Sequence, residues 1–197
     1  MPNLPRRAVL SLPFAALAPS ARAQGAAQAG PFVQQTGNEL AALVADAGGL
    51  AERRRRLVPF LERVVDVDGF ARFCLGRFWT LATPAQKTEY LRLFRLVLAN
   101  GVAGHLGDQQ GTARVTTGRP ETREDGIYVP TVVERPGNKP NRVVWLVVPT
   151  AASFRIADVI AEGISLRITQ RSDYAAFLGR NGGDVGVLIR AMQSQLE

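Results

Sequence analysis

The spacing of apolar residues changes twice along this chain of 197 residues. From Phe32 to Leu106 apolar side chains recur every three or four positions, which is typical of amphipathic helices. Between residues 113 and 162 the pattern becomes strand-like, in four segments separated by turn residues. Helical spacing returns after Gly163. Strands joined by short turns and flanked by helices indicate an α+β fold with an antiparallel sheet.

The strongest helix signal begins at Thr83. Thr83 supplies a capping hydroxyl, Pro84 suits the first helical position, and Gln86 completes a capping box. This helix is predicted to end near Gly101 or Gly104. The segment before it, 67–81, is predicted as one helix with two apolar surfaces. It either packs inside a core on both sides or lines a cavity for a ligand that is not protein.

Other boundaries follow from caps and breakers. A helix is predicted over 32–45, and a second from Leu50 with a break at Pro59, because proline lacks an amide hydrogen. Ser172 is predicted to start a short helix, and Asp184 to cap a last amphipathic one.

The third predicted strand, 143–148, is apolar on both faces. Such a strand must be covered on both sides or face a dry hollow. The expected architecture is α+β, with N-terminal and C-terminal helices wrapped on a four-stranded antiparallel sheet. Such an arrangement can enclose an apolar cavity, and its expected shape is that of cystatin-like or NTF2-like domains.

The N-terminus has the features of an export signal. Two arginines precede an apolar run, and Ala21-Arg22-Ala23 forms an A-x-A site, so residues 1–23 are predicted to be cleaved. Residues 24–31 are predicted as a flexible arm and 32–197 as a single domain. Cleavage removes three arginines and no acid, so the formal net charge falls from +7 to +4. The predicted destination is the periplasm, by the Sec or the twin-arginine route.

Composition excludes several functions. The hydrophobic content of 46% suffices for one good core, and no apolar run after the N-terminus is long enough to span a membrane. The modest charge and the exported destination disfavour nucleic-acid binding. Glycine-rich nucleotide motifs and the nucleophile-elbow motif are missing from the sequence.

Few side chains are suited to catalysis or metal binding. The single cysteine, Cys74, and the single histidine, His105, both fall on apolar helix faces, which favours structural roles over a zinc site or a Cys-His nucleophile. Asp158 and Glu162 would share a strand face as an acid-base pair, which is the minor alternative of a pocket enzyme. No enzymatic activity, catalytic residue or metal ligand is expected.

The run 53–56 consists of four arginines, which wrap around a helix and cannot form one basic face. The favoured interpretation is a solvated surface with arginine stems lying along apolar groups. The alternative is that one or two of them meet phosphate headgroups or an acidic partner.

Two separated blocks of the sequence match the pattern of a known protein family. The first block consists of Phe70-Ala71, Leu75-Gly76-Arg77-Phe78-Trp79, Ala82-Thr83-Pro84-Ala85-Gln86-Lys87 and Phe94. The second block is Asp158 to Leu166, DVIAEGISL, and the segment from Gly182 to Leu196 is similar to the family's closing helix. With these blocks the sequence resembles the toluene-tolerance or MlaC family of periplasmic phospholipid-binding proteins, and the resemblance extends over residues 57–195.

This resemblance implies a carrier that takes the acyl chains of a phospholipid into an apolar pocket. It implies shuttling between an outer-membrane lipoprotein complex and an inner-membrane ABC transporter with an MCE-type subunit, in support of outer-membrane lipid asymmetry. No cofactor is implied besides the lipid cargo, and a monomer is expected. One branch of the family is associated with hopanoid synthesis loci, so a hopanoid is an alternative cargo.

The predicted lipid-binding residues are apolar and come from the helices and the sheet. They are Leu75, Phe78, Trp79, Tyr90, Phe94, Val97, Val129, Val133, Trp145, Val147, Ile156 and Ile164. Ordinary core packing is an equally weighted alternative for each, because apolar periodicity does not distinguish a cavity wall from a filled core.

Overall fold

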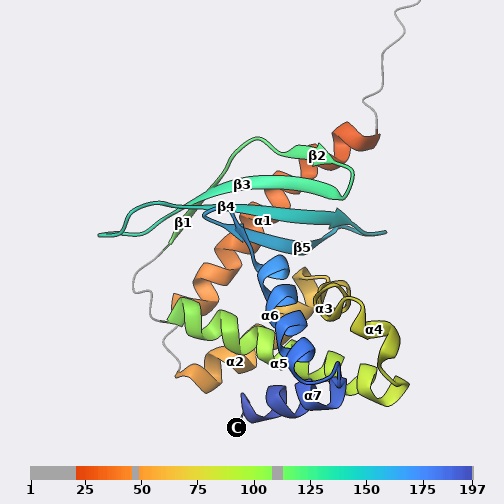
Figure 1. The fold of residues 1–197 in the computed structure, drawn as a ribbon. Helices are drawn as coiled ribbons and strands as arrows, with labels where there is room; N and C mark the ends of the chain where they lie inside the picture. The colour runs from red at the N-terminus through yellow and green to blue at the C-terminus, as the bar shows by residue number, and fades with distance from the viewer. Residues whose placement is uncertain (1–20, 46–48, 108–112, 197) are drawn as a thin grey trace, which may run out of the picture.

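The structure is a computed structural model that describes residues 21–45, 49–107 and 113–196. Its helices are α1 (Ala21–Ala45), α2 (Leu50–Val64), α3 (Val67–Leu75), α4 (Phe78–Leu81), α5 (Pro84–Gly107), α6 (Leu166–Arg180) and α7 (Val185–Ser194). Its strands are β1 (Arg114–Thr117), β2 (Glu121–Arg123), β3 (Gly126–Glu134), β4 (Asn141–Pro149), β5 (Phe154–Ala161) and β6 (Ile164–Ser165). The sheet forms one end of the molecule, α2 to α7 form the other, and α1 joins the two (Figure 1).

The predicted α+β fold is confirmed, but the described sheet has six strands instead of four. Five strands lie in the order β1-β3-β4-β5-β6, β2 also pairs with β3, and every pair is antiparallel. The predicted first strand is split into β1 and β2 at residues 118–120, where Pro120 has no amide hydrogen to donate. The two-residue strand β6 follows a tight turn at Glu162 and Gly163, both of which have positive φ.

The strand register defines an inner face of the sheet. Val129 lies opposite Trp145, and Val147 lies opposite both Ile127 and Ile156. Residues directly opposite each other in a ladder point to the same face. All five of these side chains are buried, so the inner face is the one that packs on the core.

The alternate residues define the outer face. Leu146 lies opposite Tyr128 and Asp158, and Val144 lies opposite Ile160. Leu146 and Asp158 are buried, whereas the other three are half-buried. Of the two predicted alternatives for β4, cover on both sides or a dry hollow, the burial fits cover on both sides at the centre of the strand and less so toward its ends.

Helix α1 lies against the inner face and the sheet edge. The Phe32 ring lies 5.7 Å from that of Phe154 on β5, and a side chain added at Gly37 would meet Val115 on β1 at 3.1 Å. Residues 24–31, predicted as an arm, are helical, and Ala29 is fully buried. This segment is helical although it contains Gly25, Gly30 and Pro31, so burial against the sheet and not local propensity stabilises the helix there. Residues 1–20, most of the predicted signal, lie outside the described residues.

Two predicted boundaries in the helical region are wrong. Helix α2 continues through Pro59. Because Pro59 has no amide hydrogen, the carbonyl group of Arg55 loses its helical hydrogen bond, and both residues are exposed. Water can therefore replace the missing hydrogen bond. The predicted helix 67–81 is two helices, because Gly76 adopts a φ of 55° that ends α3 before α4 begins.

The predicted start of α5 is confirmed by both hydrogen bonds of a capping box. The Thr83 amide donates to Gln86 Oε1 at 2.9 Å, and the Gln86 amide donates to Thr83 Oγ1 at 3.2 Å. The helix runs to Gly107, past the predicted end. Gly101 and Gly104 are exposed, so they only lower the helical propensity there and do not break the helix.

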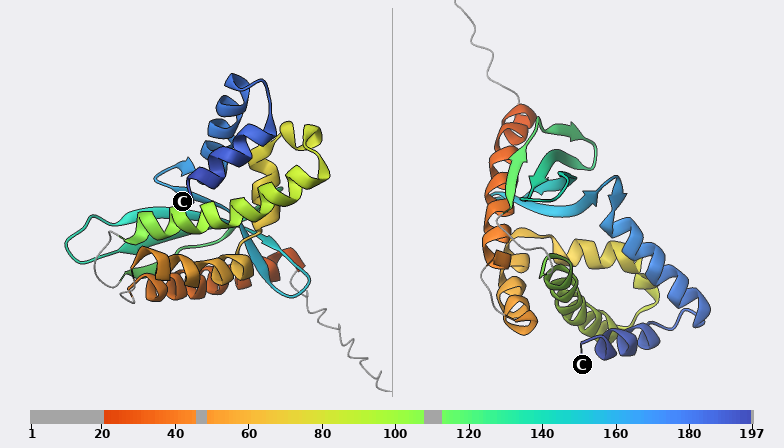
Figure 2. Two further views of the ribbon diagram at one scale, coloured as in Figure 1. Left: turned by 90° about the horizontal axis from the view of Figure 1, so that it is seen from below. Right: turned by 90° about the vertical axis from the view of Figure 1, so that its left-hand side faces the viewer.

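The C-terminal helices are only partly as predicted. Helix α6 begins at Leu166 and not near Ser172, because Ser165 is its cap and accepts a hydrogen bond from the Ile168 amide. The predicted cap of α7 is confirmed, since Asp184 accepts from the Gly186 amide at 2.7 Å. Helix α6 leads from β6 away from the sheet toward α7 (Figure 2).

Candidate functional site

The predicted lipid-binding residues on the strands lie on one face of the sheet. Val129, Trp145, Val147 and Ile156 belong to the inner face, and Val133 follows Val129 by four positions on β3, which keeps it on that face. Val129 and Val147 are fully buried, whereas Val133 is half-buried near the sheet edge. The structure therefore brings these five side chains together as one apolar surface.

The predicted residues on the helices are less uniform. Leu75, Phe78, Tyr90 and Phe94 are buried, and Val97 is half-buried against the same core. They form one cluster with the inner face of the sheet. The helical layer and the sheet thus supply opposite sides of a single apolar interior.

Trp79 and Ile164 lie apart from this pattern. Trp79 is half-buried, with the Arg72 guanidinium 5.2 Å and the Lys87 ammonium 5.4 Å from its ring. The break at Gly76 separates it from the face of α3 that its spacing predicts. Ile164 is 61% exposed, so its side chain lies outside the buried core. Trp79 packs against the margin of the core, whereas Ile164 remains a predicted lipid-binding residue outside it.

Four aromatic rings gather where α3, α5 and α6 meet. We call Phe70, Tyr90, Phe94 and Tyr174 the aromatic cluster; its paired ring centroids lie 5.6 to 6.5 Å apart, mostly edge to face. The Tyr90 hydroxyl donates to the Ala71 carbonyl at 2.8 Å. Sequence analysis missed Phe70 and Tyr174 as candidates because periodicity within one helix does not show which rings of other helices meet it.

Burial controls the ionisation of the cluster. It raises the pKa of the hydroxyls of Tyr90 and Tyr174 far above the ordinary tyrosine value. Both hydroxyls therefore stay protonated near neutral pH and can act as donors. The cluster offers neutral hydrogen bonding in an otherwise apolar setting.

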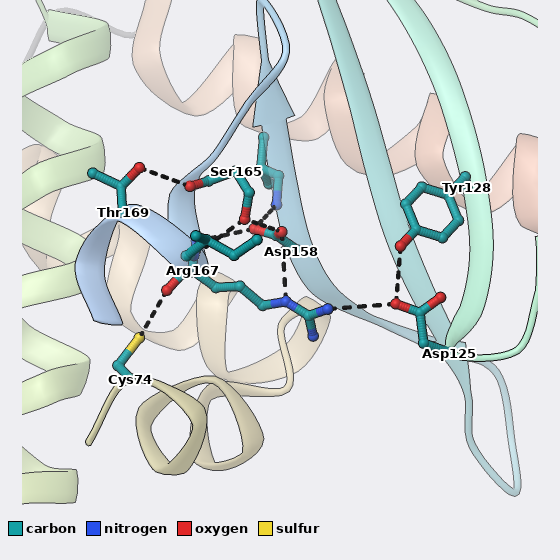
Figure 3. Close-up of polar contacts among 9 residues, drawn as sticks. Cys74, Asp125, Tyr128, Asp158, Ser165, Arg167 and Thr169 are labelled. Atoms are coloured by element: carbon teal, nitrogen blue, oxygen red, sulfur yellow. Dashed lines mark hydrogen bonds and ion pairs between the residues drawn. The ribbon is translucent and has the colours of Figure 1, made fainter. Parts of the chain in front are cut away.

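The outer face carries a polar corner, formed by Asp158, Ser165 and Arg167 where β5 leads through β6 into α6 (Figure 3). The Asp158 carboxylate accepts from the Ser165 hydroxyl at 2.5 Å and from the Arg167 amide at 3.1 Å. The Arg167 guanidinium also lies 3.5 Å from Asp158 and from Asp125. These contacts fix the direction in which α6 leaves the sheet.

The polar corner accounts for the acidic residues of the second sequence block. Asp158 is 2% exposed, and its carboxylate accepts from the Val159 amide on β5, the Ser165 hydroxyl and the Arg167 amide. Glu162 is exposed, and its carboxylate accepts from the Arg142 amide at 2.7 Å, which closes the turn after β5. Asp158 points to the outer face, away from the apolar interior. These contacts assign both carboxylates to fold stability instead of acid-base chemistry.

Cys74 is buried, as predicted, and its thiol donates to the Arg167 carbonyl at 3.7 Å. Burial raises the pKa of this thiol to about 12, so it is protonated and unreactive near neutral pH. The side chain of His105 lies outside the described residues. Within the described ranges no group of three or more potential ligands is placed to hold a metal ion, and no helix is long and apolar enough to cross a membrane.

The arginine run 53–56 makes contacts within the protein. Arg54 donates to the Asn100 side chain on α5 at 3.2 Å, and Arg55 and Arg56 both pair with Glu52, at 2.6 and 2.8 Å. These pairs are largely solvent-exposed and contribute little to stability. Such contacts fit the favoured interpretation of a solvated surface, and partner docking stays a prediction.

A surface hollow of about 660 Å³ lies between α1 and α2. Its lining consists of Glu39, Ala42, Leu43, Arg56, Pro59, Phe60 and Arg63. Arg63 pairs with Glu39 at 2.6 Å and stacks over Phe60 at 5.4 Å. None of the twelve predicted lipid-binding residues lines this hollow, so it is a feature separate from the apolar interior.

Comparison with known proteins places the chain in a family. The family model described as MlaC protein matches residues 33–194. A similar solved structure is that of a phospholipid-binding protein from Ralstonia solanacearum in complex with a phospholipid. The two are 21% identical, and the match covers 86% of this chain and 97% of that chain with a TM-score of 0.74. The structural likeness concerns the fold, and the family match over residues 33–194 shows that the chain belongs to the MlaC protein family.

Proposed function

We propose that this protein is an exported carrier that holds a phospholipid with its acyl chains in the apolar interior and its headgroup in water. The observation that carries the proposal is the MlaC family match over residues 33–194. It is supported by the similar protein from Ralstonia solanacearum, whose structure contains a bound phospholipid. The continuous apolar surface formed by the inner face and the aromatic cluster is chemically suited to acyl chains.

The physical need for such a carrier is large. Each methylene exposed to water costs about 0.8 kcal/mol, so two acyl chains with roughly thirty methylenes cost on the order of 20 kcal/mol. A lipid therefore needs a protein that replaces water around its tails during transfer. Because no bond is broken, such a protein needs no catalytic group, which agrees with the structural roles of Asp158 and Glu162.

We place the tails between α5 and the inner face of the sheet. Helix α5 packs on α2 and α7, whereas the sheet is contacted by α1, α2, α3 and α6. The predicted lipid-binding residues on α5 and those on the strands thus belong to two layers, which α2 and α3 connect. Entry of a tail requires these layers to part, as in a pocket that opens when its ligand binds.

The proposed route is through the periplasm. The carrier accepts a lipid at an outer-membrane lipoprotein complex and exchanges it with an inner-membrane ABC transporter that has an MCE-type subunit. The predicted export signal, 1–23, supports this location. This segment contains the paired arginines Arg6 and Arg7 and no Asp or Glu. These features fit both the Sec and the twin-arginine export route.

The test is to purify the protein after export, extract it with organic solvent, and identify the extract by mass spectrometry. We expect about one phospholipid per chain. Recovery of a hopanoid instead would change the cargo class but keep the carrier role. Folded protein that contains no lipid and binds none from vesicles would contradict the proposal.

A further inference from the structure

The hydroxyl of Tyr174 is an exception within the aromatic cluster. Tyr174 is 7% exposed, and its hydroxyl oxygen is buried with no hydrogen-bond partner among the described residues. The polar groups of two other buried rings are satisfied: the Tyr90 hydroxyl donates to the Ala71 carbonyl, and the Trp145 indole donates to Thr131. An unpaired buried hydroxyl lowers stability, so one that is kept in a fixed position has another use.

The position of Tyr174 is fixed from both ends of α6. At the start, the Ser165 cap and the Asp158 carboxylate hold the first turn. At the end, the Gly183 amide donates to the Leu178 carbonyl at 2.8 Å, and Leu178 is fully buried. The ring itself contacts Tyr90 and Phe94 at centroid distances of 6.2 and 6.5 Å. The hydroxyl is therefore held ready for an acceptor.

We propose that the Tyr174 hydroxyl donates a hydrogen bond to an ester carbonyl of the bound phospholipid, an inference that rests on the proposed function. The surroundings select this acceptor. A phosphate would need charged partners to enter a site lined by Tyr90 and Phe94, because burying an unpaired charge is far more costly than burying a neutral carbonyl. In a diacyl phospholipid, the ester carbonyls are the acceptors bonded directly to the hydrocarbon chains. Tyr174 thereby sets how deeply the tails enter.

The test compares two lipids and two tyrosine variants. The delipidated exported protein is titrated with dioleoyl phosphatidylglycerol and with its dialkyl ether analogue, which has the same headgroup and chains but no ester carbonyls. Tyr174→Phe is expected to weaken binding of the ester lipid by roughly threefold to tenfold, the range for one neutral hydrogen bond. It is expected to leave binding of the ether lipid unchanged.

Tyr90→Phe is the matched control, because its hydroxyl is already paired with a carbonyl of the protein. Any effect of this variant on affinity should be the same for both lipids. Equal effects of Tyr174→Phe on both lipids, as expected if the hydroxyl serves only a buried water, would overturn the inference. If neither lipid binds the wild-type protein, the proposed function fails as well, so the two failures are distinguishable.

A second measurement does not depend on lipid. In the delipidated protein, Tyr174→Phe removes an unpaired polar atom, so the melting temperature should stay the same or rise. Tyr90→Phe removes a satisfied hydrogen bond and should lower it. A fall for Tyr174→Phe as large as that for Tyr90→Phe would show that the Tyr174 hydroxyl is already satisfied in the free protein, and would also overturn the inference.

Discussion

The two faces of the sheet are buried by different means. The inner face is covered by α1 and the apolar interior, and its central residues Val129 and Val147 are fully buried. The outer face is covered mainly at its centre, where the polar corner lies beside Leu146. Non-directional apolar contacts can rearrange around a guest, whereas the directional hydrogen bonds of the corner cannot. The comparison teaches that one face of the sheet can admit a ligand while the other keeps the helices in place.

The largest expected difference is between neighbouring valines on β4. Val147→Asp places an unpaired carboxylate on the inner face and should lower the free energy of unfolding by about 4 kcal/mol or more. Val148→Asp, on the half-buried outer face, should cost about 1 kcal/mol. Urea denaturation of both variants measures the difference. Similar losses for the two valines would contradict the assignment of inner and outer faces.

The next effect concerns the polar corner. Asp158→Ala removes the acceptor of the Ser165 hydroxyl and of the Arg167 amide, so the free energy of unfolding should fall by about 3 kcal/mol. Asp173→Ala, at an exposed position on α6, is the control and should change stability by about 0.5 kcal/mol or less. Chemical denaturation of the two variants checks this. Equal stability of the two variants would show that Asp158 does not anchor α6.

Cys74 links the two regions, because its side chain is in the core and its thiol donates to Arg167 of the corner. Its pKa in the folded state is about 12, raised by burial from 9.0. Above pH 9 the unfolded chain loses this proton and the folded protein keeps it. The contribution of the thiol to the free energy of unfolding is therefore fully present below pH 9. It falls by about 1.4 kcal/mol per pH unit up to pH 12.

Denaturation of wild type and Cys74→Ala at several pH values between 8 and 11 measures this contribution. The stability of the variant should fall less steeply with rising pH, while the buried tyrosines affect both proteins alike. Identical slopes would show that the thiol is accessible to water. Slow reaction of Cys74 with a thiol reagent in the folded protein is the parallel expectation.

The smallest expected difference in stability is between variants that lack the hydroxyl of Tyr90 and of Tyr128. Tyr90→Phe removes a buried hydrogen bond to the Ala71 carbonyl and should cost about 1 kcal/mol. Tyr128→Phe removes a solvent-exposed hydrogen bond to Asp125 on the outer face and should cost about 0.5 kcal/mol or less. Thermal melts of the two variants check the order. A larger loss for Tyr128 would mean that the outer face contributes more than its exposure indicates.

Local signals predicted a large part of the fold. The capping box at Thr83 and the cap at Asp184 were sufficient because each depends on residues within one helical turn. The predicted lipid-binding residues on β3 and β4 share the inner face, since strand geometry places every second residue on one side. The family resemblance, carried by the two sequence blocks, is confirmed over residues 33–194.

The wrong predictions share a cause. The break at Gly76 depends on a positive φ, and the path of α2 through Pro59 depends on which side of the helix meets water. The helical state of residues 24–31 depends on burial against the sheet. In each case the outcome depends on backbone conformation, solvent exposure or burial in the folded chain, which the local residue pattern does not show.

The sequence by itself determined the succession of a helical, a strand and a second helical region, the two capped helices and the apolar stripes, because these depend on neighbours a few positions away. Only the tertiary structure decided which stripes face each other. It placed Asp158 in the polar corner and not in a pocket, and it left Tyr174 beside Tyr90 and Phe94 without a partner for its hydroxyl. Periodicity assigns a side chain to a face of its own element, whereas burial and hydrogen-bond partners depend on elements distant in the chain.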